Sequence, residues 1–258
     1  MSSGPAQVAT APSAPIVLSD ADKLRLIQAA IPDAKAMIFT AENDPNLTDA
    51  ERTELTKGAG RLRRGDTTYV YGGVPNQPNA GGSASVDPET GAGQISIDHT
   101  KSYYFNAGGT VNVRALANTL IHEGRHIYDF HFYGQSGVRS VAEVRRTERN
   151  AYMTGAILDK STGHVEFTTD PTTSAIVQLT PATANFAAEG SVRSWVTAAR
   201  ISFPANNLIV DSNNRAIDRY NRDVRAYNAH PGRSGPPLPL KPRQQRYVIP
   251  VYTPPTSY

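Results

Sequence analysis

The sequence predicts a single α+β domain with an irregular segment at each end. Amphipathic helical periodicity dominates the middle of the chain, and short β-rich or alternating runs separate the helical segments. Ser, Pro, Ala and Gly are concentrated near the N-terminus, and Pro is concentrated near the C-terminus. We therefore expect a disordered leader over 1–18, a folded domain over 19–230 and a Pro-rich, partly docked tail over 231–258.

The composition excludes several classes of protein. The chain of 258 residues has no cysteine, so disulfides, thiolate catalysis and Cys-based zinc sites are excluded. It has no apolar run long enough to span a membrane, and its N-terminus lacks the features of a Sec signal peptide. The net charge is only +3 and the basic residues are scattered, so we expect a soluble protein without a nucleic-acid partner.

Helical segments are predicted from apolar residues spaced three or four apart. Capping boxes begin at Thr48 and Ser140, Pro32 should end the first helix, and Gly134 should stop the central one. We identify no internal repeat. The predicted helices cover 19–32, 48–58, 112–133, 140–158, 191–200 and 213–229.

The predicted strands are short, and residues 72–93 are predicted to form a loop because they are dense in Gly, Pro and Asn. In the tail, 247–249 and 251–252 are expected to dock as a terminal strand. The other predicted strands cover 36–40, 67–71, 94–98, 165–169 and 176–179.

The central helix carries the most informative motif, which is His122-Glu123-Gly124-Arg125-His126. Residues four apart share a helix face, so the two imidazoles can reach one metal ion. Glu123 leaves the same turn at another angle and suits a base acting on water. Gly124 falls on the core side of the helix, where we expect a neighbouring element to pack closely.

A hydrolytic zinc site needs a third protein ligand and an open position. Glu148 is preferred because it is a mid-helix carboxylate on an inward face of the following helix, where it needs a partner. Glu143 is the alternative, although capping of Ser140 already explains it. Asp129 lies ~10 Å from His122 along the helix axis. It is therefore expected to accept a hydrogen bond near His126, behind the metal, or to be a salt-bridge partner.

The motif, followed by a helix bearing Glu148-Arg149-Asn150-Ala151-Tyr152, resembles the gluzincin metallopeptidases over residues 94–158. It also resembles the compact zinc peptidases that pathogenic bacteria deliver as effectors or toxins. The resemblance implies a zincin-like single domain with a small mixed or antiparallel sheet, an active-site helix and a following Glu-bearing helix. It further implies Zn²⁺ as cofactor and an edge strand over Gln94–Asp98 that holds an extended substrate.

Two departures narrow the resemblance. Metzincins would have Gly and His where this chain has Asp129 and Phe132, so that subclass is excluded. Thermolysin-like members have Asp four residues after the third ligand, where this chain has Tyr152. The resemblance implies that a Tyr, His or Arg stabilises the transition state, and the sequence does not choose among Tyr152, His164, Tyr220, Tyr227 and His230. Tyr152 is also a candidate for contact with the ligands.

We expect a zinc-dependent metalloendopeptidase that acts on a protein or peptide substrate. Glu123 would take a proton from a zinc-bound water and pass it to the leaving amine. The leader and the missing Sec signal favour a secreted bacterial effector or toxin, delivered by a specialised system to act on host or target-cell proteins; otherwise the protein is cytoplasmic. The second hypothesis is a zincin-fold protein with a structural metal, which acts as a protein-binding module without turnover.

Overall fold

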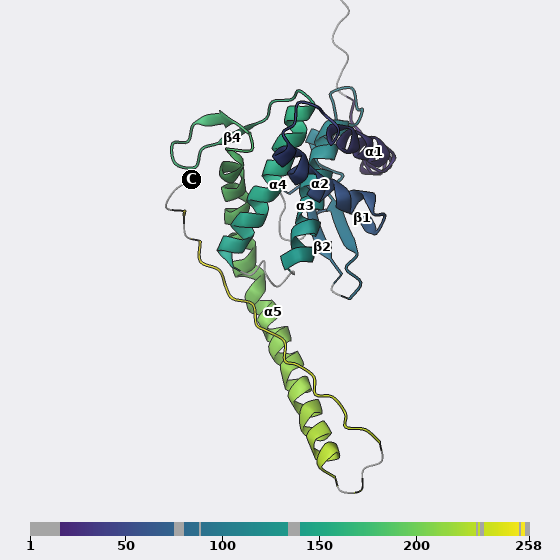
Figure 1. Ribbon diagram of the computed structural model, residues 1–258, viewed down its shortest axis with the longest axis vertical. Coiled ribbons are helices and arrows are strands. Elements are labelled where there is room, and N and C mark those ends of the chain that lie inside the picture. Colours follow the sequence, from purple (N-terminus) through teal and green to yellow (C-terminus); the bar gives the residue numbers. More distant parts are fainter. Residues whose placement is uncertain are drawn as a thin grey trace, which may run out of the picture.

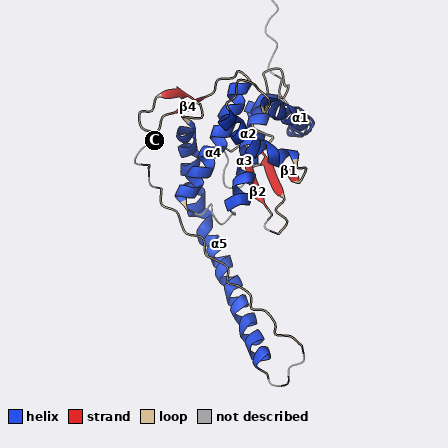
Figure 2. Cartoon of the chain, viewed as in Figure 1, coloured by secondary structure: helices blue, strands red, loops and turns tan. Residues whose placement is uncertain are grey.

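The fold is a helical head with a small sheet on one side, from which one long helix projects (Figure 1). The computed structural model describes residues 16–74, 80–87, 89–133, 140–230, 232, 235–252 and 254–255. Most of the expected leader and Gly134, the expected helix stop, lie outside these residues. Helices dominate and the sheets are small, which confirms the α+β class (Figure 2). The elements are α1 (Asp20–Ala41), α2 (Asp49–Arg63), β1 (Thr67–Tyr71), β2 (Gly82–Val86), β3 (Gly93–Ile97), η1 (Ser102–Tyr104), α3 (Val113–Tyr133), α4 (Val141–Ser161), β4 (Phe167–Thr169), β5 (Ile176–Gln178) and α5 (Ala184–Ala229).

The sheet beside the central helix is mixed and has the strand order β1-β3-β2. β3 pairs in parallel with β1 and antiparallel with β2. The strands predicted over 67–71 and 94–98 are confirmed, but β2 lies inside the predicted loop 72–93. The edge position expected for Gln94–Asp98 is therefore wrong, because β3 is the central strand. β1 and β2 are the edge strands, and β2 packs against α3.

Helix α1 continues through Pro32 to Ala41, so the predicted helix stop and the strand over 36–40 are both wrong. A proline inside a helix costs about 3 kcal/mol because it removes a hydrogen bond and crowds the preceding turn. The continuous apolar face of α1 packs against α3 and outweighs this cost. The buried residues of that face are Ile27, Ala30, Ile31, Ala34, Ile38 and Ala41.

Helix α3 is the core of the head and packs against α1, α2 and α4. At the crossing with α2, a Cβ atom on Gly124 would lie 2.8 Å from the carbonyl oxygen of Gly58. A Cβ atom on Gly58 would lie 2.9 Å from the carbonyl oxygen of Ile121. The close packing predicted at Gly124 is confirmed. α2 also continues past Gly58, its predicted end, because Ala59 and Leu62 are fully buried.

Helix α5 is a single element of 46 residues that passes through Pro204. The two helices predicted over 191–200 and 213–229 are therefore one. The first part of α5 packs against α4, and the rest extends away from the head as a stalk. The tail, residues 235–252, runs back along this stalk towards the head (Figure 1).

Four asparagines of α5, spaced by seven residues, hold the tail. Each donates its Nδ2 to a tail carbonyl at 2.8–3.0 Å and accepts the N–H of the same residue at 2.7–2.9 Å. The tail partners are spaced by three. Seven helical residues advance ~10.5 Å and three polyproline-type residues advance ~9.3 Å, so the two spacings nearly match. The pairs in this asparagine ladder are Asn207–Tyr247, Asn214–Gln244, Asn221–Lys241 and Asn228–Leu238.

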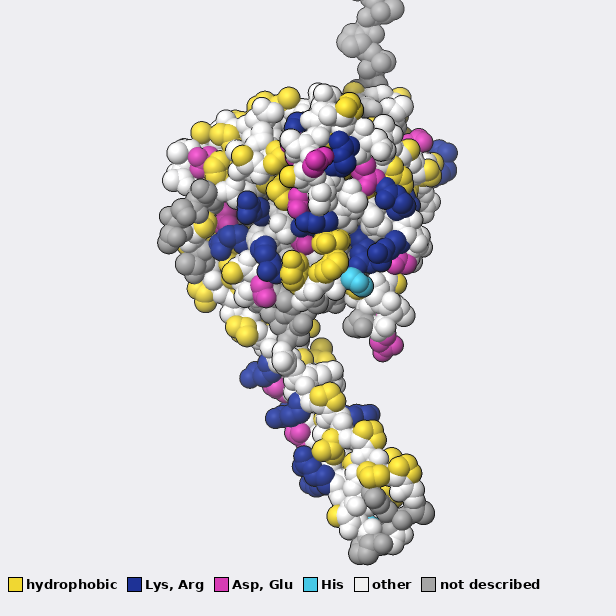
Figure 3. All heavy atoms as spheres, viewed as in Figure 1, with side chains coloured by type: hydrophobic (Ala, Val, Ile, Leu, Met, Phe, Trp, Pro, Cys, Tyr) yellow, Lys and Arg dark blue, Asp and Glu magenta, His cyan; other side chains and the backbone are white. Residues whose placement is uncertain are grey.

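The ladder explains why the predicted terminal strand is wrong. Within the described residues the tail is extended but pairs with side chains of α5 instead of with a strand. Ion pairs support the same contact, with Arg243 3.4 Å from Asp218 and Arg246 3.3 Å from Asp211. Acidic and basic side chains lie close together along this part of the surface (Figure 3). None of the helices in the described part of the chain combines the length and apolarity needed to cross a bilayer.

Candidate metal centre

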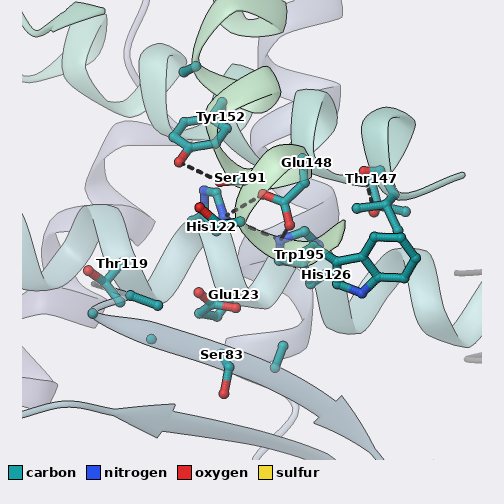
Figure 4. A pocket seen from close by; sticks show the side chains of 18 of the residues that line it. Ser83, Thr119, His122, Glu123, His126, Thr147, Glu148, Tyr152, Ser191 and Trp195 are labelled. Carbon is teal, nitrogen blue, oxygen red and sulfur yellow. Dashed lines mark hydrogen bonds and ion pairs between the residues drawn. The ribbon is translucent and has the colours of Figure 1, made fainter. Parts of the chain in front are cut away.

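The helices α3 and α4 bring three possible metal ligands together. His122 and His126 project from successive turns of α3, and their Nε2 atoms lie 3.2 Å apart. Glu148, two turns into α4, places Oε2 3.8 Å from His122 Nε2 and Oε1 3.5 Å from His126 Nε2. Figure 4 shows the two imidazoles and this carboxylate pointing towards one another. The three residues that the sequence singled out thus form one cluster.

The donor set fits a zinc ion. Atoms that bind a tetrahedral zinc at ~2.0–2.2 Å lie ~3.3 Å apart, and the distances between these three ligands are close to that value. Both imidazoles present Nε2 to the cluster, which neutral histidines can do as ligands. Two nitrogens and one carboxylate oxygen are a donor set that zinc accepts.

Glu143 lies at the start of α4, where it serves as a helix cap. Its Oε2 accepts hydrogen bonds from the backbone N–H of Ser140 at 3.2 Å and from the Ser140 hydroxyl at 2.8 Å. The capping box that the sequence predicts at this position is therefore confirmed. The cluster that could hold a metal includes Glu148 and does not include Glu143.

Glu123 lies on the other side of the histidines, between α3 and the edge strand β2 (Figure 4). Its side chain is buried and it lines the cleft. A Cβ atom on Gly82 of β2 would lie 3.1 Å from Glu123 Oε1, so the strand backbone passes directly over the carboxylate. Burial, and then the charge of Glu148, raises the pKa of Glu123 well above its usual value. A raised carboxyl pKa favours a group that takes up and releases a proton in turn.

Burial also shifts the pKa values of the three ligands. It lowers the pKa of His122 to about 4 and that of His126 well below its usual value, so both rings are neutral at physiological pH. It raises the pKa of Glu148 to about 7, against a smaller opposing effect of a hydrogen bond with Ser191. Buried neutral imidazoles beside a carboxylate are ready to bind a divalent cation.

Asp129 and Tyr152 occupy different surroundings. Asp129 is fully buried and bonds to Arg125 Nε at 3.2 Å and to Asn150 Nδ2 at 3.1 Å. Asp129 is therefore the predicted salt-bridge partner. It does not accept a hydrogen bond from His126, because within the described residues the buried Nδ1 atom of His126 has no hydrogen-bond partner. The ring of Tyr152 packs edge-on against His122 with centroids 4.7 Å apart, and its hydroxyl lies 2.9 Å from Ser191 Oγ. Burial raises the pKa of Tyr152 to about 12.

A cleft of about 1360 Å³ opens from the cluster. The edge strand β2 lines one wall, and residues of α5 and the tail line the other. On the α5 side, the Trp195 and Phe203 ring centroids are 5.9 Å apart, and those of Phe203 and Tyr247 are 4.9 Å apart. We call these three residues the aromatic wall.

The sequence did not reveal β2, Ser191 or the aromatic wall as parts of the site. β2 has a Gly-Ser-Ala-Ser-Val sequence, which lacks the β-branched and aromatic residues that mark most strands. Ser191 and the aromatic wall come from elements distant in sequence from the motif, and their packing places them there. The seven-residue spacing of the asparagines on α5 is the sequence signal of the tail contact.

Comparison with known proteins does not place this chain in a family. No protein-family model matches it, and neither the curated proteins nor the solved structures contain a match. The residues of the site therefore carry the functional argument.

Proposed function

We propose that the protein is a zinc metallopeptidase in which His122, His126 and Glu148 bind the metal and Glu123 is the general base. The observation that carries this proposal is the position of Glu123. It projects into the cleft beside the three possible ligands, where it would face a water molecule and a bound peptide. A structural zinc site would instead be closed by a fourth protein ligand.

The chain's own groups would perform the proton transfers. A zinc ion held by the cluster would supply Lewis acidity, which polarises a carbonyl group and acidifies water. Glu123 then accepts the proton of the attacking water and returns it to the leaving amine. The positive charge of the cation also lowers the pKa of Glu123 from its raised value, which keeps this carboxylate available as a base.

The position of the edge strand β2 favours a peptide as the substrate. β2 is an edge strand whose residues 82–84 line the cleft, and a peptide can add to such a strand through backbone hydrogen bonds. Gly82 brings the strand close to Glu123, so a peptide bond held along β2 would lie near the base. The aromatic wall opposite favours a bulky apolar substrate side chain.

Glu123→Gln tests the catalytic role, because Gln has nearly the same shape and removes the base. Full-length protein loaded with Zn²⁺ would be incubated with a proteome-derived peptide library, and cleavage would be read by mass spectrometry. Wild type should cleave and the variant should lose about 100-fold or more of the rate. Elemental analysis should find the same zinc content in both proteins, because the substitution leaves the three proposed ligands in place. Equal cleavage by wild type and variant, or no cleavage by zinc-loaded wild type, would overturn the peptidase proposal.

An inactive, zinc-loaded wild type would favour the second candidate, a protein-binding module with a structural metal. The exposed edge of β2 and the open cleft would then hold a peptide without cleaving it. Glu123→Gln should leave such binding unchanged, as measured by pull-down followed by calorimetry with the captured peptide.

A further inference from the structure

A second group of possible ligands lies where α4 ends. Asp159 is in the last turn of this helix, and the chain then reverses at Gly163, whose φ of +67° is a conformation that glycine adopts readily. The reversal lets the His164 N–H donate to the Asp159 carbonyl at 2.8 Å. One ligand atom from each of Asp159, His164 and Glu166 lies within 4.8 Å of the others.

Asp159 is the residue of this group that needs an explanation. Its side chain is only 2% exposed, and its Oδ2 accepts a hydrogen bond from Asn118 Nδ2 at 3.0 Å. Its Oδ1 is buried without a hydrogen-bond partner in the described part of the chain. A buried carboxylate oxygen without a partner is costly, and a cation is the partner that removes the cost most directly.

The surrounding charges do not supply that partner. Burial, and then the charge of Glu166, raises the pKa of Asp159 to about 7. Arg114 acts on Asp159 and His164 from a distance, and among the described residues the structure shows no ion pair that joins it to either acid. Among the described residues, the two carboxylates and the imidazole therefore converge without an ion pair to a basic side chain.

We propose that Asp159, His164 and Glu166 form a second site for a divalent metal ion. One imidazole nitrogen and two carboxylate oxygens suit Zn²⁺ or Mn²⁺. Asn118 holds Asp159 in place, as hydrogen bonds behind a ligand commonly do. A Cβ atom on Gly155 would lie 2.4 Å from Asn118 Oδ1, so the small residue at Gly155 leaves room for this amide.

The second site is separate from the histidine cluster but shares its two helices. Asp159 follows Glu148 by eleven residues on α4, which corresponds to ~16 Å along the axis. Asn118 precedes His122 by one turn on α3. An ion at the second site would therefore tie α3 to α4 at the end of the pair away from Ser140, and it would do so whether or not the protein is a peptidase.

Metal stoichiometry tests the proposal. Chelator-stripped full-length protein would be dialysed against Zn²⁺ alone, and bound zinc would be counted by elemental analysis. Wild type should bind two equivalents, Asp159→Asn/His164→Gln one, His122→Ala/His126→Ala one, and the fourfold variant none. If wild type binds a single equivalent that Asp159→Asn/His164→Gln retains, the second site does not exist. A wild type that binds one equivalent, lost in Asp159→Asn/His164→Gln and kept in His122→Ala/His126→Ala, would contradict the proposed function. The second site would then still exist.

A titration with Mn²⁺, read by electron paramagnetic resonance, gives a second measurement. His164→Gln changes a partly exposed side chain, so this variant should fold even if Asp159→Asn does not, and circular dichroism would check both. His164→Gln should weaken Mn²⁺ binding at this site at least tenfold in a His122→Ala/His126→Ala background. An unchanged Mn²⁺ affinity in that background would overturn the proposal.

Discussion

Gly58 and Gly124 face each other where α2 crosses α3, and neither has room for a side chain. The contact lies one residue from Glu123 and two from each proposed histidine ligand, so it sets the position of the turn that carries the site. Two helix backbones can approach this closely only where both residues are small. Gly124 takes no part in the chemistry, but its lack of a side chain sets how closely α3 packs against α2 and so where the neighbouring motif residues lie.

Gly124→Ala should lower the free energy of unfolding by about 1–3 kcal/mol, because the new methyl group meets the Gly58 carbonyl oxygen and the helices must separate. Denaturant unfolding followed by circular dichroism measures this change. Gly60→Ala is the matched control, since it lies in α2 and a Cβ atom there meets nothing within 4 Å. The control should be neutral or up to ~1 kcal/mol stabilising. Equal effects of the two substitutions would contradict the role of the crossing.

Glu148→Gln should weaken zinc binding at the histidine cluster by about 100-fold or more, because a neutral amide replaces a charged ligand. Glu143→Gln should leave zinc affinity unchanged, and Gln can still cap the helix at Ser140. Competition with a chromophoric chelator measures both affinities. The reverse order of effects would move the third ligand to Glu143.

In a Glu123→Gln background, which removes the proton that zinc would also displace from Glu123, zinc affinity at the histidine cluster should depend on pH through one proton. The pKa of Glu148 is raised to about 7, so below that pH the metal-free protein must release its proton before zinc binds. The pKa of His122 is lowered to about 4 and that of His126 lies well below its usual value, so the imidazoles release none between pH 5.5 and 8. The apparent association constant should rise about tenfold per pH unit up to about pH 7 and then level off.

Chelator competition at several pH values measures this dependence. In the same Glu123→Gln background, Glu148→Gln should remove the slope, because the ligand that carries the proton is gone. A Glu123→Gln affinity that does not change between pH 5.5 and 7 would show that Glu148 binds zinc without releasing a proton there, or does not bind it.

Asn221→Ala should loosen the tail, because both backbone groups of Lys241 lose their partner in the asparagine ladder. The loss should be about 1–3 kcal/mol for the contact, and trypsin should cut after Arg243 faster than in wild type. Asn206→Ala, beside the row of ladder asparagines, is the control and should leave the cleavage rate unchanged. Identical rates for the two variants would show that the tail does not depend on the ladder.

The ligands were predictable because the relevant signals are local. Four-residue spacing on a helix places His122 beside His126, and an inward carboxylate on the next helix marked Glu148. The capping boxes at Thr48 and Ser140 were equally local and gave the starts of α2 and α4 correctly. A capping box depends on hydrogen bonds within a single turn, so residues close together in the sequence are enough to predict it.

The sequence predictions of secondary structure are wrong where contacts between residues far apart in the chain outweigh local conformational preference. Pro32 and Pro204 both lie inside helices. The contacts that these helices make along their packed faces stabilise them by more than the missing hydrogen bond costs. β2 has weak strand propensity and forms because β3 offers a partner for its backbone. The tail is not a strand because its partners are side chains spaced by a helical repeat, which a strand pattern does not indicate.

The asparagine ladder also determines how the C-terminal segment responds to force. The tail lies parallel to the stalk axis, and each of the four rungs consists of two bonds directed across that axis. A pull along the stalk therefore loads all the rungs together in shear, whereas a sideways pull opens them one after another. Beyond the ladder, the hydroxyl of Tyr252 donates to Glu189 at 2.9 Å, and Glu189 also pairs with Arg145 of α4. Tension applied at Tyr252 would thus be delivered to the helix that carries Glu148.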